Sequence, residues 1–311
     1  MYWQENSIEE IKEYLKGIEV TADIIERLAG DSRKGVRELA KKYRRIREQE
    51  KNKEERWYKM NKRELQLKEE GYKLVAGVDE AGRGPLAGPV VAAAVILKPE
   101  IKIIGLDDSK KLTERERERL FSEIKDKAVA VGVGIIDNKV IDRINILQAT
   151  FRAMQEAINK LTPRPDYILI DGNRELPGIE IQQETVVDGD SKVNAIAAAS
   201  IIAKVSRDRI LDDYHSTYPE YGFLRNKGYG TSEHIEALKK HGPSPIHRYS
   251  FSIVSKYNFL KCKEKLLKVQ NENKLYQLGE DISKYGRFSE ENLERLREIY
   301  RAQYQRIVNN K

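Results

Sequence analysis

The N-terminal part of the chain alternates apolar and polar positions with the period of an α-helix. A capping-box sequence at Ser7–Glu10 opens the pattern, which breaks at Gly30–Ser32 and resumes as a very basic helix from Val36. Helical, charged sequence then continues to about Glu70. The apolar positions of the first helix are Ile8, Ile11, Leu15 and Ile18. We therefore expect residues 1–70 to form a helical N-terminal extension.

Short apolar runs of strand length follow, with helical patterns between them. The strands expected, in chain order, are 74–78, 90–97, 129–136, 167–170 and 179–187. The helices expected are one opened by the capping box Thr113–Glu116, one over about 140–161 and one over 192–214. Several strands first, and then strands alternating with helices, predict an α/β or α+β sandwich over residues 71–256.

Helical spacing of apolar residues returns after Tyr257. The positions are Leu266, Leu267, Leu278, Leu293, Leu296 and Ile299. They predict two or three helices, and the glycines at Gly279 and Gly286 are expected to break them. We expect residues 257–311 to form a helical C-terminal extension.

Composition narrows the class of protein. Hydrophobic residues make up 40% of the 311 residues, which supports a core, and no apolar run approaches membrane-spanning length. A single cysteine, Cys262, excludes an intrachain disulfide and fits a reducing compartment. The first residues lack the basic-then-apolar order of a secretory signal. We expect a cytoplasmic protein that does not enter a membrane.

Positive charge is concentrated outside the middle of the chain. The net charge is +7, and the sharpest basic run, Arg33–Arg47, holds eight Lys or Arg residues and one Glu. Such a run is either a solvated helix face or a contact for a nucleic acid, and the sequence leaves both interpretations open.

Two adjacent carboxylates follow the first strand of the middle region. The run Leu74–Val78 leads directly to Asp79 and Glu80, and a glycine-rich segment with one arginine, Gly82–Gly88, comes next; we call it the glycine turn. Neighbouring carboxylates repel each other, and a hard divalent cation with oxygen ligands relieves the repulsion. Glycines allow a ligand to approach the backbone closely. The pattern indicates metal-assisted phosphate chemistry.

Carboxylates also follow two later strands. Tyr167–Ile170 is followed by Asp171, and the segment 179–187 is followed by Asp188 and Asp190. The functional crevice of an open α/β sheet lies at the carboxyl ends of its strands, so we expect these acids to gather there. One Asp-Gly pair is an ordinary turn, but three acidic strand ends indicate a shared metal site.

Five blocks of the chain resemble ribonuclease HII. They appear in the order of that family and cover about residues 70 to 255. The blocks are Gly77–Val91, Asp108–Leu112, Ala198–Arg209, Asn226–Thr231 and Gly242–Arg248. The resemblance implies an α/β chain of the ribonuclease H-like fold, with a central mixed five-stranded sheet flanked by helices.

The resemblance also implies the catalytic carboxylates and metal ligands, which are Asp79, Glu80, Asp171 and Asp190. Asp190 is preferred to Asp188 because the family block places its ligand directly before a Ser-Lys pair, here Ser191-Lys192. Asp190 is also expected where the next helix begins, and capping of that helix is the alternative role. An all-oxygen ligand set favours Mg²⁺ or Mn²⁺.

Substrate contacts follow from the same resemblance. Backbone groups of Gly82, Arg83 and Gly84 are expected to contact a ribose 2′-hydroxyl and the adjacent phosphate. Tyr229 resembles the tyrosine that stacks on the sugar after the ribonucleotide. Four further residues are expected to contact phosphate or to support the site: Ser109, Lys110, Lys204 and Arg207. The histidines, His215, His234, His241 and His247, show no zinc-ligand spacing and are expected to be structural.

The expected activity is endonucleolytic cleavage of RNA in RNA–DNA hybrids and 5′ of single ribonucleotides in duplex DNA, leaving 3′-hydroxyl and 5′-phosphate ends. This activity would serve ribonucleotide excision and possible primer removal. The protein is expected to be a monomer without an evident sliding-clamp motif. One rival is ribonuclease HIII, which usually has Gly-Thr-Gly where this chain has Gly-Arg-Gly. The other is a non-catalytic hybrid-binding protein, which the complete acid set disfavours.

Overall fold

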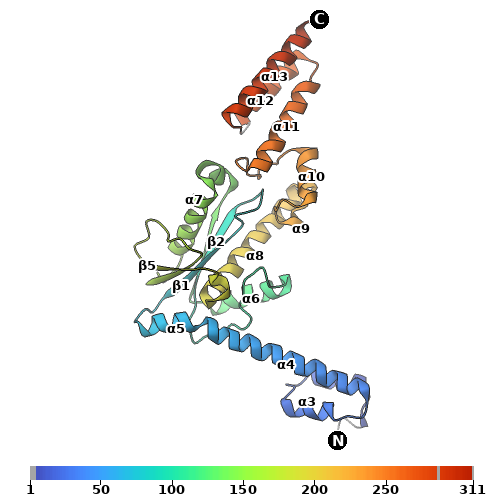
Figure 1. The fold of residues 1–311 in the computed structure, drawn as a ribbon, viewed down its shortest axis with the longest axis vertical. Helices are drawn as coiled ribbons and strands as arrows, with labels where there is room; N and C mark the ends of the chain where they lie inside the picture. The colour runs from blue at the N-terminus through green and yellow to red at the C-terminus, as the bar shows by residue number, and fades with distance from the viewer. Residues whose placement is uncertain (1–4, 286–287, 310–311) are drawn as a thin grey trace. The chain divides into compact units, whose positions relative to one another are not determined.

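Five strands form one mixed sheet in the computed structural model (Figure 1). They are β1 (Val75–Ala81), β2 (Val90–Ile96), β3 (Ala130–Ile136), β4 (Tyr167–Asp171) and β5 (Gln182–Val186). Their order across the sheet is β3-β2-β1-β4-β5. β2 runs antiparallel to both of its neighbours, whereas β4 runs parallel to both of its neighbours. The expected mixed five-stranded sheet is confirmed.

The structure describes residues 5–285 and 288–309 and divides into two units. One comprises Met1–Lys62 with Lys102–Gly105, and the other comprises Arg63–Ile101 with Leu106–Lys311. The sheet belongs to the second unit. Residues 1–4, which belong to the segment used above to argue against a secretory signal, lie outside the described residues. Gly286 also lies outside them.

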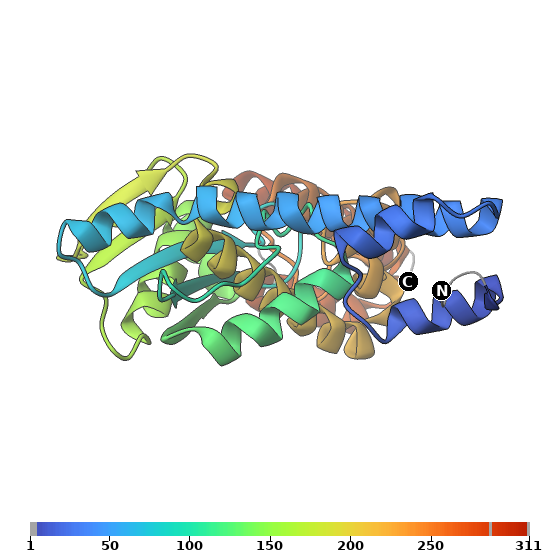
Figure 2. The ribbon, with the colours of Figure 1, turned by 90° about the horizontal axis from the view of Figure 1, so that it is seen from below.

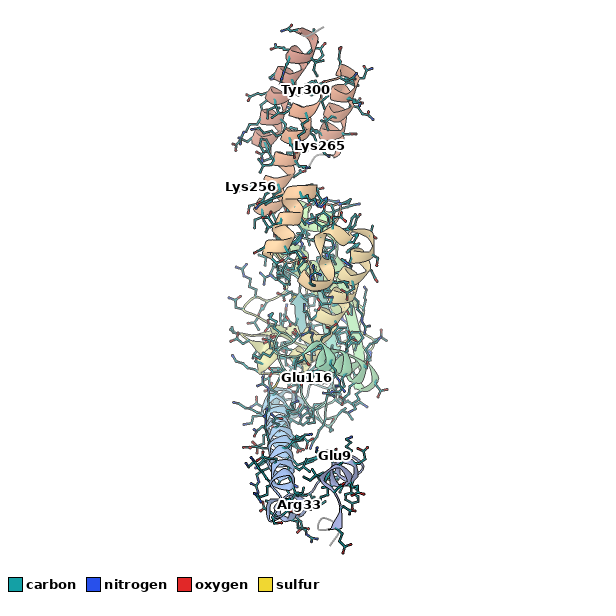
Figure 3. The ribbon with its side chains drawn as sticks, turned by 90° about the vertical axis from the view of Figure 1, so that its right-hand side faces the viewer. Glu9, Arg33, Glu116, Lys256, Lys265 and Tyr300 are labelled. Carbon is teal, nitrogen blue, oxygen red and sulfur yellow. The ribbon has the colours of Figure 1, made fainter. Side chains whose placement is uncertain are left out.

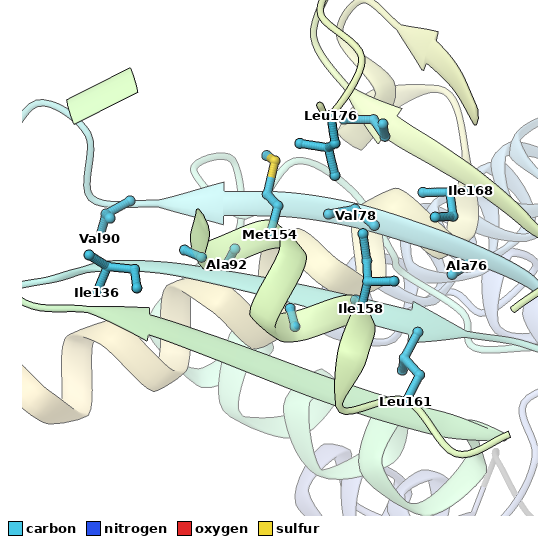
Figure 4. Packing of buried hydrophobic residues seen from close by; sticks show 14 of the residues in the cluster. Ala76, Val78, Val90, Ala92, Ile136, Met154, Ile158, Leu161, Ile168 and Leu176 are labelled. Atoms are coloured by element: carbon cyan, nitrogen blue, oxygen red, sulfur yellow. The ribbon is translucent and has the colours of Figure 1, made fainter. Parts of the chain in front are cut away.

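Two long helices cover the two faces of the sheet (Figure 1). α7 (Asn138–Asn159) packs on β2 and β3, and α8 (Asn194–Thr217) packs on β1 and β2. Met154 and Ile158 of α7 meet Val78 and Ala92 of the sheet in the main core (Figure 4). Burial of these apolar side chains stabilises the layered arrangement.

The pattern of the chain predicts α7 as one continuous helix, but the structure contains a break. Asn145 has a φ of 69°, in the left-handed region, within the helix. Its side chain accepts a hydrogen bond from the Gln148 N–H at 3.1 Å, so it caps the second half of α7. Asparagine tolerates this conformation better than most residues, which is why the break falls there.

α8 begins without a cap of its own. Its N-cap residue is Val193, which has no side-chain oxygen. Glu64, on α5 (Lys62–Glu69), supplies the missing acceptor: its Oε1 accepts from the Ala195 N–H at 2.9 Å. Glu64 is buried and its Oε2 has no hydrogen-bond partner, so burial raises the pKa of its carboxyl to about 7.

Glu64→Gln is expected to flatten the pH dependence of stability. The folded-state pKa lies above the ordinary glutamate pKa of 4.5, so the wild-type carboxyl stabilises the fold fully below pH 4.5 and loses that contribution as pH rises through about 7. The shift corresponds to about 3 kcal/mol. Urea unfolding at pH 4.5 and pH 8 measures it, because Gln keeps the acceptor for Ala195 without titrating. Equal pH dependence in the two proteins would contradict the assignment.

The described residues of the first unit form α2 (Ile8–Lys16), α3 (Ala22–Ala29) and α4 (Lys34–Met60). The expected capping box is confirmed, since Ser7 and Glu10 each accept a hydrogen bond from the other's backbone N–H. The apolar pattern does not predict α3, which starts after Thr21 caps its first turn. Figure 2 shows α4 as one continuous helix. The shared core consists of Ile11, Leu15, Ile25, Leu28, Val36, Leu39 and Ala40.

Acids neutralise part of the basic run. Arg33 pairs with Asp31, and Lys41 pairs with Glu38, both at 2.8 Å. Arg44 reaches Glu26 of α3 at the same distance. These pairs lie within the unit, so part of the positive charge of the run is already paired with acids.

The C-terminal residues form α11 (Ser252–Lys268), α12 (Glu272–Tyr285) and α13 (Glu290–Asn309). Lys256 and Lys265 lie on α11 and Tyr300 on α13 (Figure 3). The predicted break at Gly279 is wrong, because Gly279 lies inside α12. A Cβ there would come within 2.7 Å of the Tyr300 ring, so this glycine allows α12 and α13 to pack closely.

Further helices among the described residues are α6 (Glu114–Lys127), η1 (Gly189–Ser191), η2 (Pro219–Tyr221), α9 (Phe223–Asn226) and α10 (Ser232–His241). The capping box predicted for α6 is present, formed by Thr113 and Glu116. In the described part of the chain, no helix combines the length and the apolar character needed to cross a bilayer.

Candidate active site

The acidic residues lie at the carboxyl ends of three neighbouring parallel strands. Asp79 and Glu80 lie near the end of β1, Asp171 ends β4, and Asp190 lies in η1 directly after β5. Val78 of β1 pairs with Ile170 of β4, and these two strands are parallel. Asp79 and Asp171 are the next residues along them. The Gly189 N–H donates to Asp171 Oδ1 at 2.7 Å and ties η1 to the end of β4. The sheet therefore gathers the acids at one edge.

Burial and mutual repulsion disfavour ionisation of the first two acids. The pKa of the Asp79 carboxyl is raised well above its usual range by burial, and then by the charges of Glu80 and Asp171. Burial also raises the pKa of Glu80, although Arg83, whose Nη1 lies 3.2 Å from Glu80 Oε1, partly opposes it. A nearby cation would relieve this cost.

Asp190 belongs to the same cluster. Burial, followed by the charges of Asp108 and Asp171, raises its pKa to about 6. Asp188, the alternative, is different: its side chain is 76% exposed and lies 3.8 Å from Lys192 Nζ. The expectation that Asp190 stands at the start of the next helix is wrong, because α8 begins after Val193 and η1 is a separate turn. Capping of α8 is thereby excluded as the role of Asp190.

The donor chemistry of the cluster fits a hard divalent cation. Four carboxylates supply only oxygen ligands, and three of them have raised pKa values that a bound cation would lower. As the side chains stand, no group of three or more acidic, histidine or cysteine residues within residues 5–285 and 288–309 is arranged so that it could hold a metal ion. Ligation would therefore require these side chains to move.

Two buried arginines hold the glycine turn from behind. Arg207 donates to the carbonyls of Ala87, Pro89 and Lys227 at 2.9–3.1 Å. Arg248 donates to the carbonyls of Gly82, Arg83, Gly88 and Pro89 at 2.6–3.1 Å. Both guanidinium groups are almost inaccessible, at 1% and 0% exposure, and burial lowers their pKa values to about 10 and 9.

Tyr229 lies beside the glycine turn and is 43% exposed. A Cβ placed on Gly84 would be 3.7 Å from its ring. The turn's Leu86 N–H donates to the carbonyl of Gly228, the residue before Tyr229, at 2.7 Å. The aromatic ring therefore faces solvent next to the exposed backbone of Gly84.

Two buried histidines form a chain that ends on Tyr229. The Ser244 N–H donates to His247 Nδ1 at 2.9 Å, so the neutral His247 carries its proton on Nε2. His247 Nε2–H donates to His234 Nε2 at 2.9 Å. His234 therefore carries its own proton on Nδ1, which donates to the Tyr229 carbonyl, also at 2.9 Å. Burial lowers both pKa values, that of His247 to about 3, so the neutral forms persist at pH 7.

The structure separates the four residues assigned to phosphate contact or support. Lys110 is exposed and lies within electrostatic reach of Asp79 and Asp190. Lys204 is partly buried and pairs with Asp208 at 2.8 Å.

Ser109 and Arg207 are buried and hydrogen-bonded within the protein. Ser109 is buried and accepts a hydrogen bond from the Ser200 hydroxyl at 3.0 Å. Arg207 is buried behind the glycine turn, as described above. Burial of both side chains favours the supporting role, which is one of the two roles expected for them.

Sequence reasoning missed the part played by Arg248, His234 and His247 at the site. From the sequence, Arg248 and His247 are assigned only to the closing block, and both histidines are expected to be structural. The available signal was an arginine next to a histidine in an otherwise uncharged block, Gly242–Ser250. Long polar side chains in such a block are expected to be buried and bonded to backbone, which is what the structure shows.

Comparison with known proteins identifies the family. The family model "Ribonuclease HII" matches residues 76–254, and "Ribonuclease HII N-terminal domain" matches residues 7–68. A ribonuclease HII of Clostridioides difficile is 50% identical over 250 residues, 80% of this chain and 98% of the relative. The chain belongs to the ribonuclease HII family.

Another relative supports the same family, and two solved structures support the same fold. A ribonuclease HII of Acetivibrio thermocellus is 61% identical over 189 residues, which is 61% of this chain and 73% of the relative. The ribonuclease H2 structure from Pyrococcus horikoshii OT3 superposes with a TM-score of 0.52 at 31% identity, covering 60% of this chain and 97% of that one. The Bst-RNase HIII structure in complex with Mn²⁺ shares the fold at 20% identity and a TM-score of 0.50, over 59% of this chain and 68% of its own.

Ribonuclease HII membership settles several expectations. The chain is a ribonuclease H, a hydrolase with endonuclease activity, and its fold is the ribonuclease H-like α/β fold. The family model and the relatives named above favour ribonuclease HII over ribonuclease HIII. A binding protein without activity is also disfavoured.

Proposed function

We propose that this ribonuclease HII cuts the RNA strand of RNA–DNA hybrids and cuts 5′ of single ribonucleotides embedded in duplex DNA. The products are 3′-hydroxyl and 5′-phosphate ends, and the cellular role is ribonucleotide excision, with possible primer removal. One observation carries the proposal: Asp79, Glu80, Asp171 and Asp190 gather at one sheet edge beside the glycine turn.

The same four carboxylates are proposed to hold divalent metal, Mg²⁺ or Mn²⁺. Their all-oxygen chemistry supports this, as does Mn²⁺ in the related Bst-RNase HIII structure. Two such ions, when bound, activate a water molecule and stabilise the leaving oxygen of a phosphodiester. Lys110, exposed and close to Asp79 and Asp190, adds positive charge where the phosphate enters.

Recognition of the substrate is proposed to rest on the glycine turn and Tyr229. Backbone groups of Gly82, Arg83 and Gly84 contact the 2′-hydroxyl, which is the feature that distinguishes ribose from deoxyribose. The exposed Tyr229 ring stacks on the next sugar. Its position next to Gly84 supports a joint role at the RNA–DNA junction.

Cleavage of a DNA duplex with one central ribonucleotide tests the function. The protein is incubated with Mg²⁺, Mn²⁺ or chelator, and the products are sized against a ladder. We expect metal-dependent cutting on the 5′ side of the ribonucleotide. Cutting confined to longer RNA tracts would indicate a ribonuclease HIII-like specificity, and metal-independent cutting would refute the proposed ligand set.

Tyr229→Ala is expected to lower cleavage at a single ribonucleotide by about tenfold or more, because stacking contributes about 1–3 kcal/mol. Cleavage of a continuous RNA–DNA hybrid should fall less. Steady-state rates on both substrates measure the ratio. Tyr229→Phe, which keeps the ring, and Tyr276→Ala, at an exposed tyrosine of α12, are the controls. An equal loss on both substrates would refute the junction role.

The domain division stays a proposal: residues 1–70 as N-terminal extension, 71–256 as catalytic domain and 257–311 as C-terminal extension. The matched family models, over 7–68 and 76–254, support it. The monomeric state, the cytoplasmic location and the lack of an evident sliding-clamp motif also stay predictions.

A further inference from the structure

Arg248 is the most completely buried charged residue next to the glycine turn. Its side chain has no exposed surface, and its Nη2 donates to the Gly82 carbonyl at 2.6 Å while its Nη1 donates to the Arg83 carbonyl at 2.9 Å. Hydrogen bonds from a charged donor are stronger than those from a neutral donor. The guanidinium fork therefore determines the orientation of two consecutive carbonyl groups.

Those carbonyls determine where the next two amides point. In a trans peptide the C=O of one residue and the N–H of the following residue point in opposite directions. Because the Gly82 and Arg83 carbonyls point inward to Arg248, the N–H groups of Arg83 and Gly84 point outward. Neither N–H donates a hydrogen bond within residues 5–285 and 288–309. The two outward donors are therefore available to a ligand.

We propose that Arg248 is the positioning residue for ribose recognition: it turns the Arg83 and Gly84 amides toward the 2′-hydroxyl and the adjacent phosphate. This role rests on the proposed function, in which the glycine turn contacts the ribonucleotide. Arg248 itself does not touch substrate. It acts through the backbone, and a fork of donors is needed because two carbonyls must be held in one orientation.

The chain provides a matched control in Arg207. This second arginine is equally buried and also donates only to carbonyls, but its partners are Ala87, Pro89 and Lys227. None of these carbonyls belongs to the peptide groups that carry the Arg83 and Gly84 amides. The Arg207 guanidinium also lies 5.9 Å from the centre of the Tyr229 ring, and lysine keeps a cation at this position. Arg207→Lys should therefore weaken the fold without turning those two donors.

The test compares Arg248→Lys with Arg207→Lys. Lysine keeps the charge but cannot hold two carbonyls in a planar fork. Fluorescence anisotropy in chelator gives the Kd for a duplex with one ribonucleotide and for the same duplex made of DNA only. We expect Arg248→Lys to lose about tenfold of the preference for the ribonucleotide, as befits one to two hydrogen bonds. Affinity for the DNA-only duplex should fall less, because that duplex offers the phosphate contact but not the 2′-hydroxyl. Arg207→Lys should keep the preference despite a similar fall in Tm.

Each outcome is decisive. If Arg248→Lys keeps the preference, or if both variants lose it equally, Arg248 is only a structural residue and the proposal fails. If the wild-type protein binds both duplexes equally, ribose recognition by the glycine turn fails first, and the role of Arg248 fails with it. If the buried lysine prevents folding, Arg248→Gln, whose neutral amide is less costly to bury, is compared in the same way.

Discussion

Asp79→Asn is expected to reduce phosphodiester cleavage by at least about 10³-fold, the scale of losing one electrostatic stabiliser of a transition state. The variant should fold and should melt at a higher temperature than the wild type without metal. The reason is the environment of Asp79, which is buried and repelled by Glu80 and Asp171. An amide has nearly the same shape but no charge, so it removes the repulsion and also a ligand for the cation.

Single-turnover cleavage and thermal unfolding, each with and without Mg²⁺, measure the two halves of this prediction. Added Mg²⁺ should stabilise the wild type more than the variant, since a ligand that binds only the folded state raises Tm. Asp188→Asn is the matched control, because Asp188 is exposed and outside the cluster. Retained cleavage in Asp79→Asn, or equal loss in Asp188→Asn, would contradict the assignment of the ligands.

Gly77→Ala is expected to destabilise the catalytic domain by at least about 3 kcal/mol, at the upper end of overpacking costs. A Cβ at Gly77 would lie 2.1 Å from the carbonyl carbon of Ala195 and 2.3 Å from the Ile196 nitrogen. These are backbone atoms of α8, so no side-chain rotation relieves the overlap. β1 and α8 would have to separate, and β1 carries Asp79 two residues later.

Urea unfolding of Gly77→Ala measures the loss, with Gly30→Ala as the control. Gly30 ends α3 with a φ of −80°, and its nearest neighbour would be 3.7 Å from an added Cβ. Alanine there should change stability by less than about 1 kcal/mol. A stable Gly77→Ala protein with full activity would mean that α8 packs less closely on β1 than the structure shows.

The strands and most helices were predictable because their signals are local. Val90–Ile96 is an uninterrupted apolar run, and Thr113 with Glu116 forms a capping box within one turn of chain. The errors occurred where a distant contact decides the conformation. Gly279 stays helical because Tyr300 of α13 packs against it. α8 can begin at Val193, which has no capping side chain, because Glu64 accepts a hydrogen bond from the Ala195 N–H, 131 residues away in sequence.

The sequence alone determined three features of this protein: the acidic strand ends, the glycine turn and the resemblance of five blocks to ribonuclease HII. Residue type and spacing carry that information. Only the tertiary structure decided the rest. It placed Asp190 in the acid cluster and Asp188 in solvent, buried Ser109 and Arg207, and brought Arg248 and the histidine chain behind the glycine turn and Tyr229. Burial and orientation depend on contacts between residues far apart in the chain, and no local pattern encodes which side of a turn faces water.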